Sequence, residues 1–230
     1  MALGILTNVA ATYAENNLNQ TQGSLQSVLQ QLSSGSRINS GADDAAGLSV
    51  ADGLHANEAA LTQSAQNATN GVGLLQTADG ALSQVTNLLD RAVTLATEAS
   101  NGGLTTAQAT AADTEFQSIL TEIGNIGTST NFNSNAVFSA TATDFVVSDG
   151  TTSGTTTISA TTGALSTTSL GFTAADVLTS QTAAKTTLTD ITAAIATVAS
   201  QRGTIGANIN QLNAAANVAS SEEEIGRAHV

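Results

Sequence analysis

The chain has 230 residues, a net charge of −13 and only five Lys and Arg residues, a balance that argues against binding to nucleic acid or to anionic membrane surfaces. Hydrophobic residues make up 41% of the sequence but aromatic residues only 3%. This composition favours narrow apolar interfaces between helices, called seams below, over a broad aromatic core. The lack of Cys excludes disulfides and zinc–thiolate sites, and no apolar run is long enough to predict a membrane span.

The first predicted element is a helix over residues 1–32, because large apolar residues recur there at heptad spacing. Leu18, Leu25 and Leu32 are seven residues apart, and Val28 lies between the last two. Such a stripe is typical of a helix that packs lengthwise against another helix. An isolated helix of modest length is marginal in water, so we expect residues 1–32 to be largely frayed in a monomer.

A small polar loop over residues 33–40 follows this helix. Its Ser and Gly residues are typical of helix ends, and a new helix is expected at once. Ser40 and Asp43 have the spacing of a capping box, and Asp43 and Asp44 stand where a helix N-terminus favours negative charge. Taken alone, these residues predict an ordinary connection between two helices.

Two long apolar seams, in which steps of four and three residues alternate, predict helices that pack as a coiled coil or bundle. The first seam comprises Leu61, Ala65, Ala68, Val72, Leu75, Leu82, Leu89, Val93 and Ala96. The second comprises Leu188, Ile191, Ile195, Val198, Ile205, Ile209, Leu212, Ala216 and Ala219. Asp79 and Thr86 interrupt the first seam, and Arg202 interrupts the second. A shorter helix is expected over residues 116–126.

Residues 138–175 lie between the helical regions and are rich in Thr, Ser and Gly. Asp149-Gly150 and Ser153-Gly154 divide short β-branched runs, which predicts two or three small strands joined by hairpin turns. The predicted fold is therefore mainly α: long antiparallel helices in a rod-like coiled-coil bundle with a small β-hairpin insert. The polar residues beside the seams are mostly uncharged, which favours packing against copies of the same chain.

Three segments resemble the N-terminal conserved region of bacterial flagellins and occur in the order found in that family. They are LSSGSRINSGADDAAGLSVADGL, NATNGVGLLQTADGALSQVTNLLDRAVTLATEASNG and TEFQSILTEIGNIGTSTNFN. A fourth segment, LTDITAAIATVASQRGTIGANINQLNAAANVAS, is similar to the start of the C-terminal conserved region. The resemblance covers most of residues 1–135 and 176–224, whereas the insert carries no recognisable family motif.

The resemblance implies that the chain is divided like a flagellin. Residues 1–32 would form the N-terminal helix of the filament core, and residues 33–40 the joint between two radial layers. Residues 41–137 and 176–224 would form the two parts of a helical rod domain, with residues 138–175 as a variable β-rich insert. The implied function is that of a structural subunit that polymerises into the flagellar filament for motility.

Polar residues near the joint are candidates for contacts between subunits. Arg37 and Asn39 match the family motif, where polar fastening between neighbouring subunits is their expected role. Asp43 and Asp44 are assigned with them to the joint or to a subunit interface.

A second group of candidates follows from a known partner of some flagellins, an innate immune receptor of the Toll-like class that contacts the outer helical domain. The positions that match its contacts are Arg91, Leu95 and Glu115. Leu95 lies outside the predicted seam, which leaves room for an exposed side chain. The alternative is that Leu95 packs toward the bundle and that Arg91 is a solvated helix residue. The surrounding residues 92–94 are less charged than in the familiar pattern, so weak or absent binding is the alternative.

The resemblance also implies partners and a location. The partners are other copies of the chain in a helical filament, the flagellar export apparatus, a flagellin chaperone, the filament cap and hook-associated proteins. The location is the secreted, extracellular filament, which subunits reach without a cleaved signal. No nucleic-acid partner, membrane insertion or cofactor is expected.

The chemistry of the sequence does not predict an enzyme. No Ser, His and acid constellation stands out, so no catalytic residue and no metal site are assigned. Two alternatives to a filament subunit remain open. One is a hook–filament junction protein of the same apparatus, and the other is an unrelated extracellular helical adhesin that uses the Thr-rich insert.

The tail, Ile225–Val230, has no counterpart in the flagellin pattern. A complete flagellin returns through a C-terminal helix that pairs with the N-terminal one, so the resemblance implies a chain truncated before that helix. One back-translation of the tail resembles a sequencing-library adapter, and we expect residues 225–230 to be non-native. A divergent natural end is the alternative.

Overall fold

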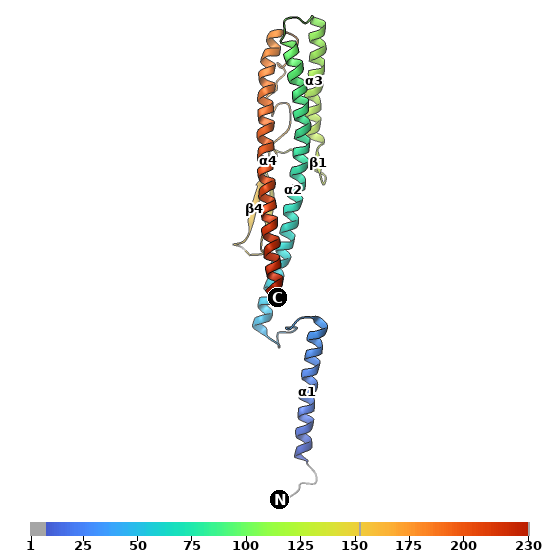
Figure 1. The fold of residues 1–230 in the computed structure, drawn as a ribbon, viewed down its shortest axis with the longest axis vertical. Coiled ribbons are helices and arrows are strands. Elements are labelled where there is room, and N and C mark those ends of the chain that lie inside the picture. The colour runs from blue at the N-terminus through green and yellow to red at the C-terminus, as the bar shows by residue number, and fades with distance from the viewer. Residues whose placement is uncertain (1–7, 152, 230) are drawn as a thin grey trace. The chain divides into compact units, whose positions relative to one another are not determined.

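The computed structural model describes residues 8–151 and 153–229, which form two compact units that meet in the sequence at Ala56 and Asn57. Most of these residues belong to α1 (Val9–Ser34), α2 (Ala45–Ala99), α3 (Thr106–Ser129) and α4 (Gln181–His229) (Figure 1). Four short strands lie between α3 and α4 in the sequence. The prediction of a mainly α fold with a small β insert is confirmed.

Helix α1 has well-formed caps at both ends. The side chain of Asn8 accepts hydrogen bonds from the N–H groups of Ala10 and Ala11 at 3.1 and 3.4 Å. Gly35 ends the helix with a left-handed φ of 74°, a conformation that other residues rarely adopt, and its N–H donates to the Gln31 carbonyl. The heptad pattern of residues 1–32 corresponds to α1 where the structure describes it, and residues 1–7 lie outside the described residues. Fraying of this helix in a monomer stays a prediction.

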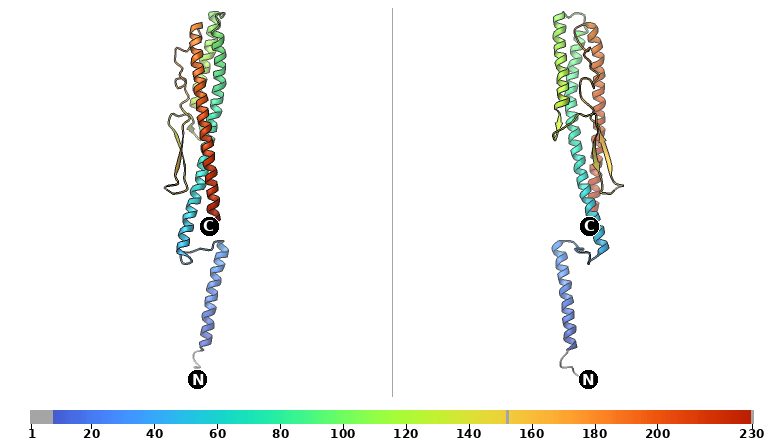
Figure 2. Two further views of the ribbon diagram at one scale, coloured as in Figure 1. Left: turned by 60° about the vertical axis from the view of Figure 1, so that its left-hand side comes forward. Right: turned by 180° about the vertical axis from the view of Figure 1, so that it is seen from behind.

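The second unit is a helical bundle in which α3 and α4 each run antiparallel to α2 (Figure 1 and Figure 2). Its fully buried side chains include Leu75, Leu82 and Leu89 on α2, Phe116 and Ile123 on α3, and Ile191, Ile205 and Leu212 on α4. Burial of one such side chain contributes about 1.5–3 kcal/mol. Phe116 also meets Phe172 edge to face, with ring centroids 6.2 Å apart.

The buried face of α2 agrees with the predicted seam at every seventh residue but not between those positions. The buried series with three- and four-residue steps is Leu61, Ser64, Ala68, Gly71, Leu75, Ala78, Leu82, Val85, Leu89, Ala92, Ala96 and Ala99, and Leu74 and Leu95 are buried beside it. The predicted intermediate residues Ala65, Val72 and Val93 are only partly buried. The prediction followed the larger apolar residues, whereas close helix packing places smaller side chains in the interface. Asp79 and Thr86 are polar residues at two of the predicted intermediate positions, and their polarity already indicated that these positions do not face the core.

Helix α4 shows the same shift. The buried series is Ala184, Thr187, Ile191, Ala194, Val198, Ile205, Leu212 and Ala219. The predicted intermediate residues Leu188, Ile195, Ile209 and Ala216 are partly buried beside the core. A bundle helix needs an apolar stripe wider than two positions per heptad, which explains why both sets are apolar.

The two charged residues that interrupt the predicted seams meet each other. Arg202 donates through Nε to Asp79 Oδ1 at 2.7 Å and through Nη2 to Asp79 Oδ2 at 3.3 Å. This hydrogen bond raises the pKa of Arg202. The pair therefore joins α2 and α4 at one defined register, at the edge of the buried interface.

The insert forms a hairpin that packs on the bundle. Strand β3 (Thr143–Val147) pairs antiparallel with β4 (Thr156–Ala160), and the predicted Asp149-Gly150 and Ser153-Gly154 turns lie between them. The hairpin prediction is confirmed. Ile158 and Ala160 on β4 are buried in the common hydrophobic core.

Polar side chains of α2 hold the outer edge of β3. Ser64 donates its hydroxyl to the Ser148 carbonyl and accepts the Ser148 N–H, both at 2.7 Å. Asn67 donates its side-chain N–H to the Val146 carbonyl at 3.1 Å. These contacts pair backbone groups of a strand edge that would otherwise lack partners.

A second, shorter hairpin precedes the predicted insert. It consists of β1 (Asn131–Phe132) and β2 (Asn135–Ala136), joined by Asn133 and Ser134 with φ values of 49° and 65°. Two-residue strands are too short to show an alternating pattern, and Asn-Ser is a weaker turn signal than Asn-Gly. Residues 161–180, which follow β4, form turns and irregular segments.

Gly127 on α3 allows one of these segments to contact the helix. A Cβ atom at Gly127 would lie 1.9 Å from the carbonyl oxygen of Leu165, closer than any atom can approach. Gly124, one turn earlier on the same helix, has open space at the equivalent position. The two glycines therefore have different structural roles.

We expect Gly127→Ala to lower the free energy of unfolding by about 1–3 kcal/mol, because the backbone at Leu165 must move away. Gly124→Ala is the matched control and should raise the free energy of unfolding by roughly 0.5–1 kcal/mol, the helix propensity difference. Urea denaturation followed by circular dichroism measures both. Equal effects of the two substitutions would show that the Leu165 contact does not matter.

Candidate functional site

Helix α1 carries a stripe of large apolar side chains and has no buried residue. Its exposed apolar residues are Val9, Tyr13, Leu18, Leu25, Val28, Leu29 and Leu32, with exposed fractions from 54% to 77%. Leu29 extends the stripe predicted from heptad spacing, whereas Val9 and Tyr13 fall outside it, at other heptad positions. Contiguous apolar surface of this kind marks an interaction site.

The polar side of α1 has almost no charge. Glu15 is the only charged residue of this helix, and the remaining polar residues are Asn, Gln, Ser and Thr. The hydroxyls of Thr21 and Ser24 donate to backbone carbonyls one turn earlier, at 2.8 and 3.0 Å. Such a helix can be enclosed by other helices without burying unpaired charge.

The turn between α1 and α2, residues 35–44, is organised by the carboxylate of Asp43. Its Oδ2 accepts hydrogen bonds from the N–H of Asn39 at 3.1 Å, and from the N–H and hydroxyl of Ser40 at 2.9 and 3.1 Å. These three bonds lower the pKa of Asp43, the one from Asn39 most. Asn39 in turn donates its side-chain N–H to the Ser36 carbonyl at 3.0 Å.

The predicted capping role of Ser40 is wrong, because α2 begins at Ala45. Asp44 is the residue that caps α2: its Oδ1 accepts the N–H of Ala46 at 3.1 Å and of Gly47 at 2.9 Å. The Ser40–Asp43 contact exists but closes a separate turn, since the Asp43 N–H donates to the Ser40 carbonyl. The connection is therefore shifted relative to the expected 33–40.

Arg37 lies exposed on this turn. Its carbonyl accepts a hydrogen bond from the Gln31 side chain at 2.9 Å, which fixes the backbone. Its guanidinium has no hydrogen bond or ion pair with any described residue. The turn thus presents a positive group on a locally ordered backbone.

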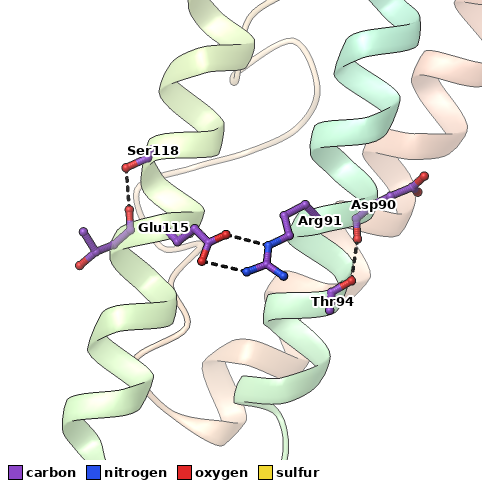
Figure 3. A network of polar contacts seen from close by, with 6 residues as sticks. Asp90, Arg91, Thr94, Glu115 and Ser118 are labelled. Atoms are coloured by element: carbon purple, nitrogen blue, oxygen red, sulfur yellow. Dashed lines mark hydrogen bonds and ion pairs between the residues drawn. The ribbon is translucent and has the colours of Figure 1, made fainter.

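Arg91 on α2 and Glu115 on α3 form a bidentate ion pair (Figure 3). The Nε–Oε1 distance is 2.7 Å and the Nη2–Oε2 distance is 3.1 Å. The hydrogen bond raises the pKa of Arg91 and lowers that of Glu115. Both side chains are about half exposed, at 53% and 46%, so the pair belongs to the surface.

Leu95 does not share this surface. It is 3% exposed and belongs to the hydrophobic core of the bundle. Of the two alternatives for Leu95, the structure supports packing toward the bundle, because Leu95 lies with Ala92, Ala96 and Ala99 among the buried residues of α2. The structure brings Arg91 and Glu115 together and separates Leu95 from them.

A pair of carboxyl groups was not indicated by the sequence. Asp176 is buried, and its Oδ2 accepts the N–H of Thr173 at 2.6 Å. Burial, followed by the contact with Asp176, raises the pKa of Asp190 on α4. Isolated Asp residues far from any motif give no sequence signal for such a pair.

The hollows on the second unit offer little chemistry. One hollow of about 640 Å³ lies between α3 and residues 167–174 and is lined mainly by Thr, Gly and apolar residues. Within the described part of the chain, no group of three or more His, Asp and Glu residues could hold a metal ion. No helix described by the structure has the length and hydropathy of a membrane span.

Comparisons with known proteins agree on one family. A family model, the bacterial flagellin N-terminal helical region, matches residues 5–143. Flagellin 1 of Proteus mirabilis is 40% identical over 151 residues, which cover 66% of this chain and 41% of that protein. The flagellin of Xenorhabdus nematophila is 39% identical over 150 residues, which cover 65% of this chain and 48% of that protein. The chain thus spans less than half the length of these relatives.

The crystal structure of Bacillus cereus flagellin has a similar fold. The TM-score is 0.57 with 31% sequence identity, and the match covers 66% of this chain and 88% of that chain. Sequence and fold therefore point to the same relatives.

We expect the amide protons of Asn39 and Ser40 to report the ionisation of Asp43 below its ordinary pKa of 3.8. Because the folded pKa is lowered, the stabilising bonds are fully present above pH 3.8 and are lost as the pH falls through the folded pKa. NMR titration of the two amide shifts measures this. In Asp43→Asn, the same shifts should no longer titrate in this range; an unchanged titration would assign the transition to another group.

Proposed function

This chain belongs to the bacterial flagellin family, and from that premise we propose that it is a structural, non-catalytic subunit that polymerises into the flagellar filament for motility. The relatives named above are flagellins, but the chain spans less than half of their length, so the activity of the whole protein is inferred. The observation that supports the proposal most is the exposed apolar stripe of α1.

The exposed apolar side chains of α1 can be covered by another helix. A helix with large apolar residues exposed by half or more gains free energy when another helix covers them, at about 25 cal/mol per Å². Its nearly uncharged polar side removes the desolvation cost that charged residues would add. Copies of the same helix satisfy both conditions, which favours a multi-subunit core made from residues 1–32.

We further propose that residues 33–40 act as a joint between this core helix and a rod domain formed by residues 41–137 and 176–224. Asn39, Asp43 and Asp44 order the turn, and Arg37 presents its guanidinium for contact with a neighbouring subunit. An arginine can form bidentate bonds with a carboxylate or with backbone carbonyls of the neighbour.

The proposal extends to the route and the location of the protein. The flagellar export apparatus, a flagellin chaperone, the filament cap and hook-associated proteins would be its partners, and the extracellular filament its location. A hook–filament junction protein is the alternative within the same apparatus. The relatives found here are flagellins by name, which supports the filament subunit over an unrelated adhesin.

We also propose that residues 225–230 are non-native, with a divergent natural end as the alternative. Helix α4 continues through His229, and Arg227 contacts Glu58 at 2.5 Å and Glu223 at 2.7 Å. Sequencing of the gene beyond this region tests whether residues 225–230 are native.

We expect Leu25→Asp to reduce filament formation at least tenfold, because it places a charge in the buried core and removes about 2 kcal/mol of apolar burial per subunit. Gln26→Asp is the matched control: it adds the same charge to the neighbouring exposed polar position and should polymerise nearly as well as the parent. Sedimentation and electron microscopy of filaments from cells that express the complete gene as their only flagellin measure the effect. Equal losses in both variants would point to charge alone and would count against the stripe.

We also propose that the Arg91–Glu115 pair is a contact for a Toll-like immune receptor. Both groups are half exposed, and Arg91 has the multi-donor geometry that often dominates interfaces. Since Leu95 is buried, the contact would be mainly ionic and sensitive to salt.

Arg91→Ala and Glu115→Ala should each weaken binding to the receptor ectodomain roughly tenfold. Arg202→Ala is the control, because it removes a second inter-helix pair of the same kind from another part of the bundle. Surface plasmon resonance at low and high salt measures the affinities. Binding by the parent that both substitutions leave unchanged would rule out this contact.

A further inference from the structure

The connection between α2 and α3 contains an exposed Asn-Gly dipeptide, Asn101-Gly102. Asn101 and Gly102 are both exposed and lie between the end of α2 at Ala99 and the start of α3 at Thr106. The backbone N–H of Asn101 donates to the Glu98 carbonyl at 3.1 Å. Among the described residues, the Asn101 side-chain amide and the Gly102 N–H have no hydrogen-bond partner.

The same dipeptide occurs at Asn70-Gly71 in a very different setting. Gly71 lies inside α2, where its N–H belongs to the helical hydrogen-bond ladder, and it is buried. A Cβ at Gly71 would lie 2.9 Å from Leu212 Cδ1 and 3.0 Å from Phe145 Cδ1, so side chains of α4 and β3 pack directly against the helix at this point. The chain therefore contains two copies of one dipeptide, one in an exposed connection and one inside a packed helix.

We propose that Asn101 is a site of spontaneous deamidation for which water is the only co-reactant. The backbone nitrogen of Gly102 loses its proton to solvent hydroxide and attacks Cγ of Asn101, forming a C–N bond. The bond from Cγ to the side-chain nitrogen breaks, and the nitrogen leaves as ammonia, so that a five-membered succinimide remains. Water then opens the ring at either carbonyl and yields aspartate or isoaspartate.

The surroundings of Asn101 favour this reaction in two ways. Gly102 has no side chain that would hinder approach of its nitrogen to Cγ. The short connection also lies outside the helical ladder, and segments with few backbone hydrogen bonds open at low free-energy cost. At Asn70, by contrast, attack requires the middle of α2 to unwind.

The product adds one negative charge to a chain whose net charge is already −13. The new carboxylate stands just beyond the C-terminal end of α2, whose last turn has no basic residue and contains Glu98. Deamidation therefore changes the electrostatic surface at this end of the bundle. The reaction does not depend on polymerisation, so its test is separate from that of the proposed filament role.

The test compares the two sites within one sample. The folded protein is incubated in mildly alkaline buffer made with heavy-oxygen water and is then cleaved after Glu, which places Asn101 in peptide 99–115 and Asn70 in peptide 59–98. Mass spectrometry should show replacement of NH₂ by OH at Asn101, with one heavy oxygen, at least roughly tenfold faster than at Asn70. In denatured protein the two rates should become similar.

Gly102→Ala provides the matched variant. The added Cβ meets only the Gln181 side chain at 3.4 Å, an ordinary contact, so the fold should be kept, as circular dichroism can verify. We expect the reaction at Asn101 to slow roughly tenfold, because the Cβ restricts the backbone and hinders the attack. Equal rates at Asn101 and Asn70 in the folded protein, or no effect of Gly102→Ala, would overturn the proposal.

Discussion

The structure of the second unit depends on the close approach of α2 and α4 along a seam that repeats every seven residues. At Gly71, an added Cβ would lie 2.9 Å from Leu212 Cδ1, so the two helices pack closely at that layer of the seam. Ala78 and Ala92 on α2 and Ala194 on α4 are fully buried, so small side chains also occupy other layers of the core. Large Leu and Ile side chains alternate with these small ones, which lets the layers interdigitate at the density of a protein interior.

The ion pair between Asp79 and Arg202, beside the seam, specifies the register of α4 on α2 more than it adds to the free energy of unfolding. The Asp79–Arg202 side chains are 40% and 37% exposed, and ion pairs at such positions contribute about 0–1 kcal/mol. A shift of α4 along α2 by one heptad would preserve much of the apolar pattern but would separate these two charges. The pair therefore distinguishes one register from others that hydrophobic burial alone would tolerate.

In contrast to the packed bundle, the first unit exposes its helix α1 to solvent. Its helix α1 has good caps and an ordered connection, but the helix itself contributes no buried residue. Its local structure is thus specified within the chain, whereas its apolar stripe is left exposed. In the filament proposed above, other copies of the chain would cover this stripe.

The sequence by itself determined the mainly α class, the helices, the β3–β4 hairpin and the residues at every seventh position of both seams, because periodicity and turn chemistry are local properties. The tertiary structure decided which intermediate positions of the seams are buried. From the sequence, a step of three residues followed by four is equivalent to a step of four followed by three, and the partner helix selects the positions with small side chains.

The site residues divided in the same way. Asp43 and Asp44 were placed near a helix start by local charge preference, but the helix boundary decided that Asp44 is the cap. The pairing of Arg91 with Glu115, the meeting of Asp79 with Arg202 and the burial of Leu95 arise from contacts between helices distant in sequence, which only the packed bundle specifies.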